Sequence, residues 1–173
     1  MDSPQAFFAT CPKGLESLLA DELRALGAGT VKETRAGVAF SGDLASAYRA
    51  CLWSRLASRV LLPLARFPAP TPEALYAGVQ QIVWRDHVTP DGTLAVDCAT
   101  VQSAVNHSYY AALKVKDAIV DQLRDRFGVR PSVDTERPDL RVHLYLHRDE
   151  ATISLDLSGE SLHRRGYRAQ PVE

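Results

Sequence analysis

The hydrophobic positions in the first third of the chain predict short strands that alternate with amphipathic helices. Leucines recur every three or four residues between Lys13 and Leu26, which is the period of a helix that buries one face, and Gly27 ends it. A second helix is predicted from Asp43, a good N-cap, through about Ser58. Short runs of aromatic and β-branched residues predict four strands, over Phe7–Thr10, Thr30–Arg35, Gly37–Phe40 and Val60–Leu64.

The order of these elements is strand, helix, strand, strand, helix, strand. This order favours a ferredoxin-like βαββαβ domain, in which both helices cover one face of a four-stranded sheet. The inward face of the second helix is expected to consist of Leu44, Ala47, Tyr48, Cys51, Leu52 and Leu56.

A proline-dense segment, Phe67–Pro72, predicts a boundary between two domains, because proline removes backbone donors and stiffens the chain. After it, Thr71 is expected to cap a helix whose first residue is Pro72. The later pattern predicts a strand over Thr93–Thr100, a long helix over Ser108–Phe127 and a hairpin of Leu140–Leu146 with Ala151–Leu157. We therefore expect an α+β protein with domains over residues 1–66 and 67–168, and the start of a linker over 169–173.

Composition and charge narrow the class of protein. The chain has 173 residues, of which 46% are hydrophobic and 24% charged, as in a folded domain and not in a disordered chain. No apolar stretch approaches the roughly 20 residues that cross a bilayer, and no signal-peptide pattern is present, so we expect a cytoplasmic protein without a membrane partner.

The formal net charge of −1 argues against binding nucleic acid by bulk positive charge. Residues 1–90 carry nine Lys and Arg against eight Asp and Glu, and residues 91–173 carry eleven against thirteen. A nucleic-acid surface on this chain must therefore be a local patch.

Motifs for catalysis, cofactors or metals do not stand out. The nearest match to a glycine-rich cofactor turn, Gly27-Ala28-Gly29, follows a helix instead of a strand, and we interpret it as a helix C-cap and turn. His143 and His147 lie on a predicted strand, where four residues span about 13 Å, which is too far for one metal ion. Three cysteines without a C-x-x-C pair are interpreted as buried free thiols: Cys11, Cys51 and Cys98.

Basic and aromatic residues gather at two places that fit RNA. The start of the long helix carries Lys114 and Lys116 after Tyr109 and Tyr110, and Asn106 lies just before it. Three aspartates farther along that helix oppose a phosphate there, so a plain amphipathic helix stays an alternative: Asp117, Asp121 and Asp125.

Near the end of the chain, arginines surround a tyrosine beside a flexible glycine, and this cluster suits phosphate contact and base stacking: Arg164, Arg165, Tyr167 and Arg168. A solvated linker paired with acidic neighbours fits the same residues equally well. A third pair, Arg55 and Arg59, is attributed to the end of the second helix, where the helix dipole favours cations. The candidate RNA-binding residues are thus those of the first two places, and no residue is assigned to catalysis or to a metal.

Four blocks carry a resemblance to a known family: Gly14–Gly27, Ser54–Leu64, Ser108–Leu123 and Asp156–Arg168. In this order they resemble the N-terminal region of the large bacterial 23S ribosomal RNA guanine-N2 methyltransferases. The resemblance covers essentially the whole chain and implies a ferredoxin-like domain followed by an α/β THUMP domain. It also implies a fragment, with methyltransferase domains that use S-adenosylmethionine beginning after Glu173.

The expected role is therefore positional. The resemblance implies that this module binds ribosomal RNA of the large subunit, while the missing domain holds S-adenosylmethionine and performs the chemistry. Two alternatives stay open. One is the front end of a tRNA-modifying THUMP enzyme, and the other is a protein-interaction module without direct RNA contact. The sequence does not define the oligomeric state.

Overall fold

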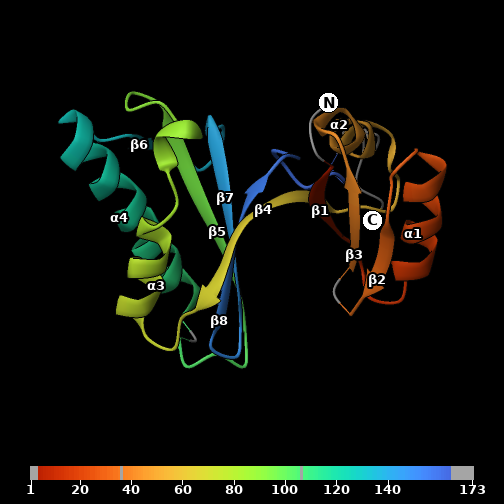
Figure 1. Cartoon of the computed structure of the whole chain (residues 1–173), viewed down its shortest axis with the longest axis horizontal. Coiled ribbons are helices and arrows are strands. Elements are labelled where there is room, and N and C mark those ends of the chain that lie inside the picture. The colour runs from red at the N-terminus through yellow and green to blue at the C-terminus, as the bar shows by residue number, and fades with distance from the viewer. Residues whose placement is uncertain (1–3, 36, 106, 165–173) are drawn as a thin grey trace, which may run out of the picture. The chain divides into compact units, whose positions relative to one another are not determined.

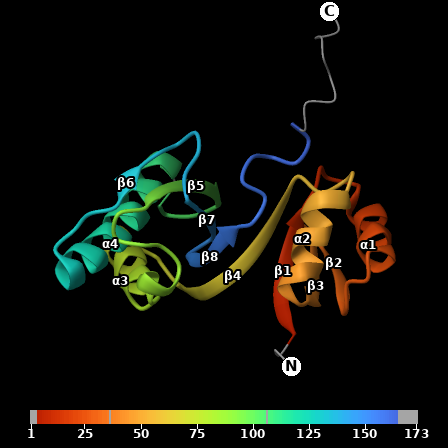
Figure 2. The same ribbon diagram turned by 90° about the horizontal axis from the view of Figure 1, so that it is seen from above.

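The computed structural model describes residues 4–35, 37–105 and 107–164. It contains two compact units, and each is described by itself (Figure 1). Unit 1 comprises residues 1–62 and 157–173, and unit 2 comprises residues 63–156, within the described ranges. Strand β4 (Arg59–Pro68) is the element that the two units share: its first residues pair in unit 1, and its later residues belong to unit 2 (Figure 2).

Unit 1 has the predicted ferredoxin-like arrangement. Its sheet has the order β2-β3-β1-β4, and each neighbouring pair of strands is antiparallel. The elements before β4 are β1 (Gln5–Thr10), α1 (Glu16–Ala25), β2 (Val31–Thr34), β3 (Gly37–Gly42) and α2 (Leu44–Trp53).

The core of unit 1 lies between this sheet and the two helices. Phe7 of β1 and Phe40 of β3 are register partners, and their rings stack with centroids 5.3 Å apart. Leu19 and Leu23 of α1 are fully buried against them, as the leucine spacing predicted. Gly27, with a φ of 84°, follows α1 in the left-handed conformation, which confirms the C-cap interpretation of this glycine.

The second helix differs from its prediction. Asp43 is its N-cap as expected, and the carboxylate accepts a hydrogen bond of 2.7 Å from the Ser46 amide. However, α2 ends at Trp53 and not near Ser58. The expected inward face was also wrong at three positions, because Leu44, Tyr48 and Leu52 are exposed and the residues that α2 buries are Ala47 and Ala50.

A carboxylate from the other helix of unit 1 explains where α2 ends. The buried Ser54 hydroxyl donates to Glu22 Oε2 at 2.5 Å, and the Arg55 amide donates to Glu22 Oε1 at 3.0 Å. Ser54 Oγ in turn accepts from the Ala57 amide at 2.9 Å. These bonds turn the chain away from the helix and into β4.

Unit 2 has a mixed sheet with the order β4-β8-β7-β5-β6. β5 (Thr93–Val101) is parallel to β6 (Ser132–Val133) and to β7 (Leu140–His147), whereas β7 and β8 (Glu150–Asp156) form the predicted antiparallel hairpin. Its helical elements are α3 (Pro72–Gln80), the 3-10 turn η1 (Trp84–Asp86) and α4 (Ser108–Phe127). Figure 1 shows α3 and α4 on the same side of this sheet.

The predicted start of α3 and the predicted end of α4 are confirmed, whereas α3 ends at Gln80 and not at Ile82 as its apolar spacing predicted. Thr71 caps α3 by accepting from the Ala74 amide at 3.2 Å, Pro72 is the first helical residue, and Gly128 ends α4 with a φ of 71°. Amide side chains tie the helices together: Gln80 Nε2 donates to the Ala118 carbonyl at 2.7 Å, and Gln122 Nε2 donates to the Ile82 carbonyl at 2.9 Å.

The division of the chain adds two observations to the domain boundaries predicted from the sequence. The proline-dense segment lies within unit 2, where Pro68 ends β4 and the Ala69 amide donates to the Asp149 carbonyl at 2.7 Å. Residues that follow β8 belong to unit 1, because the Leu157 amide donates to the Val60 carbonyl and the Leu162 amide donates to the Ser58 carbonyl, both at 2.9 Å. The domain boundaries at residues 66 and 168 stay a prediction.

We expect Glu22→Gln to destabilise unit 1 at neutral pH. Burial raises the pKa of Glu22, but hydrogen bonds from Ser54, Arg55 and Leu56 outweigh it and hold the pKa below the ordinary value of 4.5. The charged form therefore stabilises the fold above the pKa of the unfolded chain, and this stability is lost as the pH falls through the lowered folded pKa. Urea unfolding at pH 7 should show a loss of about 1–3 kcal/mol, and the difference from the parent should shrink in acid.

Asp21→Asn is the matched control, because Asp21 is the neighbouring carboxylate on α1 and pairs with Arg24 on the exposed surface. It should change the free energy of unfolding by well under about 1 kcal/mol. Equal losses for the two variants at pH 7 would contradict the role given to Glu22.

Gly78→Ala should destabilise unit 2, although alanine is the better helix former by about 1 kcal/mol. A Cβ at Gly78 of α3 would lie 2.1 Å from a ring carbon of Phe67 in β4, so the ring or the helix would have to shift out of its packed position. We expect a loss of about 1–3 kcal/mol in denaturant unfolding. Phe67→Leu in the same chain should remove most of the penalty of the alanine, and additive losses in the double variant would disprove the contact.

Candidate nucleic-acid interface

The start of α4 presents aromatic rings to solvent. Tyr109 is 77% exposed and Tyr110 is 44% exposed, both in the first turn of the helix. The Lys114 ammonium lies 5.6 Å from the centroid of the Tyr110 ring, which is cation–π distance. His107, the N-cap, makes no side-chain capping hydrogen bond, and a helix start carries partial positive charge. This end of α4 therefore combines a cation, two rings and a positive backbone. Asn106 lies outside the described residues.

The two predicted lysines of α4 do not share one face. Residues two apart on an α-helix point about 200° apart around its axis, so Lys114 and Lys116 cannot contact the same phosphate. Lys116 Nζ lies 2.7 Å from Asp117 Oδ1, and its side chain is only 25% exposed. Lys114, beside Tyr110, is the better placed of the two for an external ligand.

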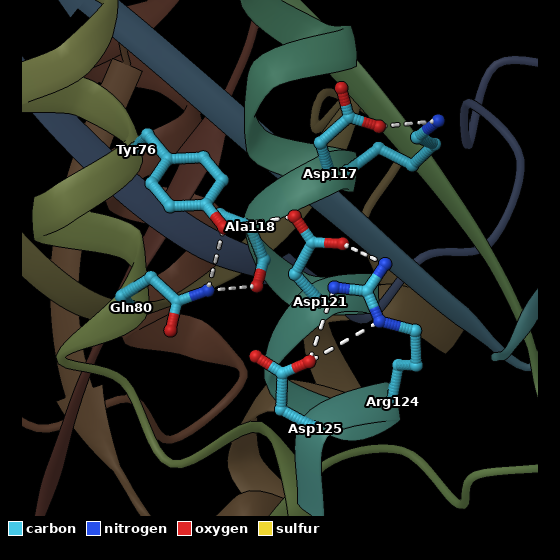
Figure 3. A network of polar contacts seen from close by, with 8 residues as sticks. Tyr76, Gln80, Asp117, Ala118, Asp121, Arg124 and Asp125 are labelled. Carbon is cyan, nitrogen blue, oxygen red and sulfur yellow. Dashed lines mark hydrogen bonds and ion pairs between the residues drawn. The ribbon is translucent and has the colours of Figure 1, made fainter. Parts of the chain in front are cut away.

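Farther along α4, acidic side chains form an internally paired network (Figure 3). Arg124 bridges Asp121 and Asp125 at 3.0 and 3.1 Å, and the Tyr76 hydroxyl of α3 donates to Asp121 Oδ2 at 2.9 Å. Asp117, one turn before, pairs with Lys116. With Arg126 in the last turn, this stretch carries three cations against three carboxylates, and the pairing within the helix makes it less favourable for a phosphate than the start of α4. The first two turns are thus the part of α4 best suited to RNA.

The second predicted cluster begins in unit 1. Arg164 is exposed and lies in a turn in which its amide donates to the Ser161 carbonyl at 2.9 Å. The Ser161 hydroxyl donates to the Ser58 carbonyl at 3.2 Å, which fixes this turn to the start of β4. The other three members of the cluster, Arg165, Tyr167 and Arg168, lie outside the described residues. The structure thus places Arg164 in unit 1 and the two lysines in unit 2.

The structure corrects the explanation given for Arg55. This arginine does not belong to the last turn of α2, because the helix ends at Trp53. Its side chain is 91% exposed, and Nε lies 3.6 Å from Glu22 Oε1. Arg59 is the first residue of β4. A helix dipole therefore accounts for neither residue.

Sequence reasoning missed Trp53, which the structure leaves 65% exposed at the end of α2. The predicted helix continued to Ser58 and gave this position no role. The only signal in the sequence was a large aromatic residue two positions before an arginine, which is too common to identify a site.

The two histidines four residues apart lie on a strand, as the sequence predicted. His143 and His147 both lie on β7, as predicted, and the His147 ring is parallel to the Tyr145 ring with centroids 6.2 Å apart. In the described part of the chain, no group of three His, Cys, Asp or Glu side chains is arranged to hold a metal ion. Among the same residues, no helix has the length and apolar character required to span a membrane.

The cysteines are half-buried and not fully buried. Burial raises the pKa of the Cys98 thiol to about 11, so this side chain is a protonated thiol at neutral pH. Burial, followed by the charge of Glu16, also raises the pKa of Cys11. None of the three is joined in a disulfide, as the sequence predicted.

Comparisons with known proteins give a consistent result for both parts of the chain. Residues 6–61 match the family model described as the RlmL ferredoxin-like domain, and residues 69–156 match the THUMP domain model. The chain is 63% identical over 172 residues to the Ribosomal RNA large subunit methyltransferase K/L of Syntrophotalea carbinolica. This alignment covers 99% of the chain and 24% of that protein, so the chain spans about a quarter of the length of this relative.

Solved structures also resemble this chain. One is a crystal structure from Listeria monocytogenes, described as a predicted N6-adenine-specific DNA methylase, with a TM-score of 0.84 and 28% sequence identity. The alignment covers 99% of this chain and 45% of the Listeria chain. The methyltransferase SMU.472, crystallised with SAH, has a TM-score of 0.85 and 28% identity over 98% of this chain and 46% of its own. The similarity to these structures thus extends over both units.

The Tyr76–Asp121 contact can be tested by titration. The hydrogen bond to Asp121, and next burial, raise the pKa of Tyr76 above its ordinary value of 10.0. We expect Asp121→Asn to lower the pKa of this phenol, because the neutral amide no longer favours the protonated hydroxyl. The difference in ultraviolet absorbance between the parent and Asp121→Asn isolates Tyr76 from the other tyrosines and should disappear when both carry Tyr76→Phe. Superimposable titration curves for the parent and Asp121→Asn would rule out the contact.

Proposed function

We propose that this chain, which belongs to the THUMP domain family, binds and positions RNA for a 23S ribosomal RNA guanine-N2 methyltransferase and performs no chemistry itself. The observation that carries the proposal is the order of the two matched domains together with 63% identity to a ribosomal RNA large subunit methyltransferase. The substrate is then RNA of the large ribosomal subunit, and the place of action is the cytoplasm.

The charge distribution supports binding through a few contacts and not through a broad basic surface. The formal net charge is −1, and the acidic network on α4 makes its first turns the most favourable part of this helix for phosphate. Phosphate contacts fix the position and orientation of an RNA without reading its sequence. This chain would therefore hold the RNA in register, while the target base reaches a catalytic site elsewhere in the longer protein.

The methyl donor belongs to that other part of the protein. A site for S-adenosylmethionine needs backbone amides at a glycine-rich turn after a strand. In this chain, Gly27 follows α1 and ends it, so the glycine pair at 27 and 29 does not fit such a site. We therefore assign the donor to the region of the relatives that this chain does not span.

Removal of basic side chains tests the proposal. Lys114→Ala with Lys116→Ala, and separately Arg164→Ala with Arg165→Ala, should weaken binding to a structured ribosomal RNA fragment while thermal unfolding stays nearly unchanged. Each lost phosphate contact should flatten the log–log salt dependence of binding by about 0.7–0.9. We further expect Lys114→Ala alone to weaken RNA binding more than Lys116→Ala, because the ammonium of Lys116 is already paired with Asp117.

Lys32→Ala is the charge-matched control, because Lys32 is exposed on β2 and outside both clusters. It should leave affinity and salt slope unchanged. If both double variants bind like the parent at low and moderate salt, the assignment fails, and a protein-interaction role becomes the better explanation. If transfer RNA competes for binding as well as the ribosomal RNA fragment does, the assignment of ribosomal RNA as the substrate is contradicted.

A further inference from the structure

A groove in unit 1 surrounds the end of α2. Its volume is about 960 Å³, and its walls combine apolar side chains with a few polar and charged ones, chiefly Glu22, Leu26, Leu52, Trp53, Arg55 and His163. We call it the Trp53 groove. Leu52 and Trp53 are 63% and 65% exposed, so two large apolar side chains of this groove face solvent. Sites for small ligands have volumes of about 300–1,000 Å³ and mostly apolar walls with a few polar groups.

Hydrogen bonds hold the backbone of the groove next to Trp53. The two carboxylate oxygens of Glu22 accept from the Ser54 hydroxyl and from the Arg55 amide, and these bonds fix the backbone directly after Trp53. Glu22 also lines the groove, but its side chain is only 12% exposed and its oxygens accept hydrogen bonds from these donors. These bonds fix the position from which the indole projects, so less of the backbone has to be ordered when a ligand binds.

The cations at the groove are available to a ligand. The Arg55 guanidinium is 91% exposed and 3.6 Å from Glu22, a separation that gives a weak surface ion pair. Arg164 follows His163 in the turn that Ser161 anchors to β4, so it lies next in the chain to a residue of the wall. Arg164 is also the first member of the basic cluster that continues to Arg168. The Trp53 groove therefore includes the sequence neighbour of Arg164, one of the residues to which the proposed function assigns RNA.

We infer that the Trp53 groove binds an unpaired RNA nucleotide, whose base stacks on the Trp53 indole while Arg55 and Arg164 contact the flanking phosphates. The inference rests on the proposed function and adds a requirement for unpaired nucleotides. An aromatic ring beside arginines is the combination that binds single-stranded nucleic acid without sequence preference, because every base has a flat face. A paired base inside a duplex keeps its faces covered and cannot stack on the indole.

The test compares a six-nucleotide single-stranded RNA with a blunt duplex that contains the same sequence. Trp53→Ala should weaken binding of the single strand by about 5- to 150-fold, which is the range for losing one base–aromatic stack, and should leave duplex binding unchanged. Trp53→Phe, which keeps a ring, should retain most of the affinity. Tyr48→Ala is the matched control, because Tyr48 is an aromatic residue on α2 that is 53% exposed and does not line the groove.

Tryptophan fluorescence supplies a second measurement. The chain has two tryptophans, and Trp84 is fully buried, so quenching by acrylamide reports on Trp53. The single-stranded RNA should protect this fluorescence from acrylamide, and the duplex should not. Repeating the measurement in the longer protein shows whether the groove is open there.

The outcomes separate this inference from the proposed function. If the parent binds neither RNA, both fail. If the parent binds RNA and Trp53→Ala binds the two RNAs as the parent does, or loses affinity for both equally, only the groove assignment is overturned. Protection of Trp53 from acrylamide in the longer protein without RNA would also overturn it, because another part of the polypeptide then occupies the groove.

Discussion

The structure of unit 1 depends on one carboxylate that joins two helices. Glu22 of α1 accepts from the Ser54 hydroxyl and from the Arg55 amide, and these bonds replace the backbone bonds that α2 would need to continue. Because the helix stops there, Trp53 points out of the fold and Arg55 lies in a turn before β4. The start of β4 in turn receives the segment after β8 through Val60 and Ser58. A largely buried, hydrogen-bonded carboxylate thus sets the end of α2 and the entry into β4, and it contributes to the wall of the Trp53 groove.

A nearly neutral chain that binds RNA must rely on how its charges are arranged. On α4, the acidic side chains are paired with Arg124 and with the Tyr76 hydroxyl, which leaves the first turns as the region where Lys114 and exposed rings dominate (Figure 3). In unit 1, Arg55 and Arg164 accompany an exposed indole. Both regions combine few cations with aromatic rings. If RNA binds there as proposed, such surfaces would gain less affinity from salt-dependent phosphate contacts and more from stacking, which would favour RNA with unpaired bases over a smooth duplex.

Local signals in the sequence were sufficient for most elements. The leucine spacing of α1, the caps Asp43 and Thr71, the glycine after α4 and the alternation of β7 and β8 each act within a few residues, and the structure confirms them. Contacts between distant residues decide what local signals do not. The predicted end of α2 was wrong because that end depends on a carboxylate 32 residues earlier in the chain. Likewise, residues 157–162 contact unit 1 through hydrogen bonds to Ser58 and Val60, far away in the sequence. No window of the sequence contains both partners of these contacts.

The same argument explains why the candidate site was only partly predicted. Lys114 and Arg164 stand out as charges near aromatic residues, which is a pattern that can be read along the chain. Trp53 does not stand out in the sequence. The expected inward face of its helix already assigned the neighbouring apolar residues Leu44, Tyr48 and Leu52 to the core, so nothing indicated an exposed apolar surface there. In the structure, small alanines bury that helix against the sheet, and the large side chains are left on the outside. A helix that uses Ala47 and Ala50 for its core contacts can approach the sheet closely and leaves its large apolar residues in solvent, and two of these, Leu52 and Trp53, line the groove.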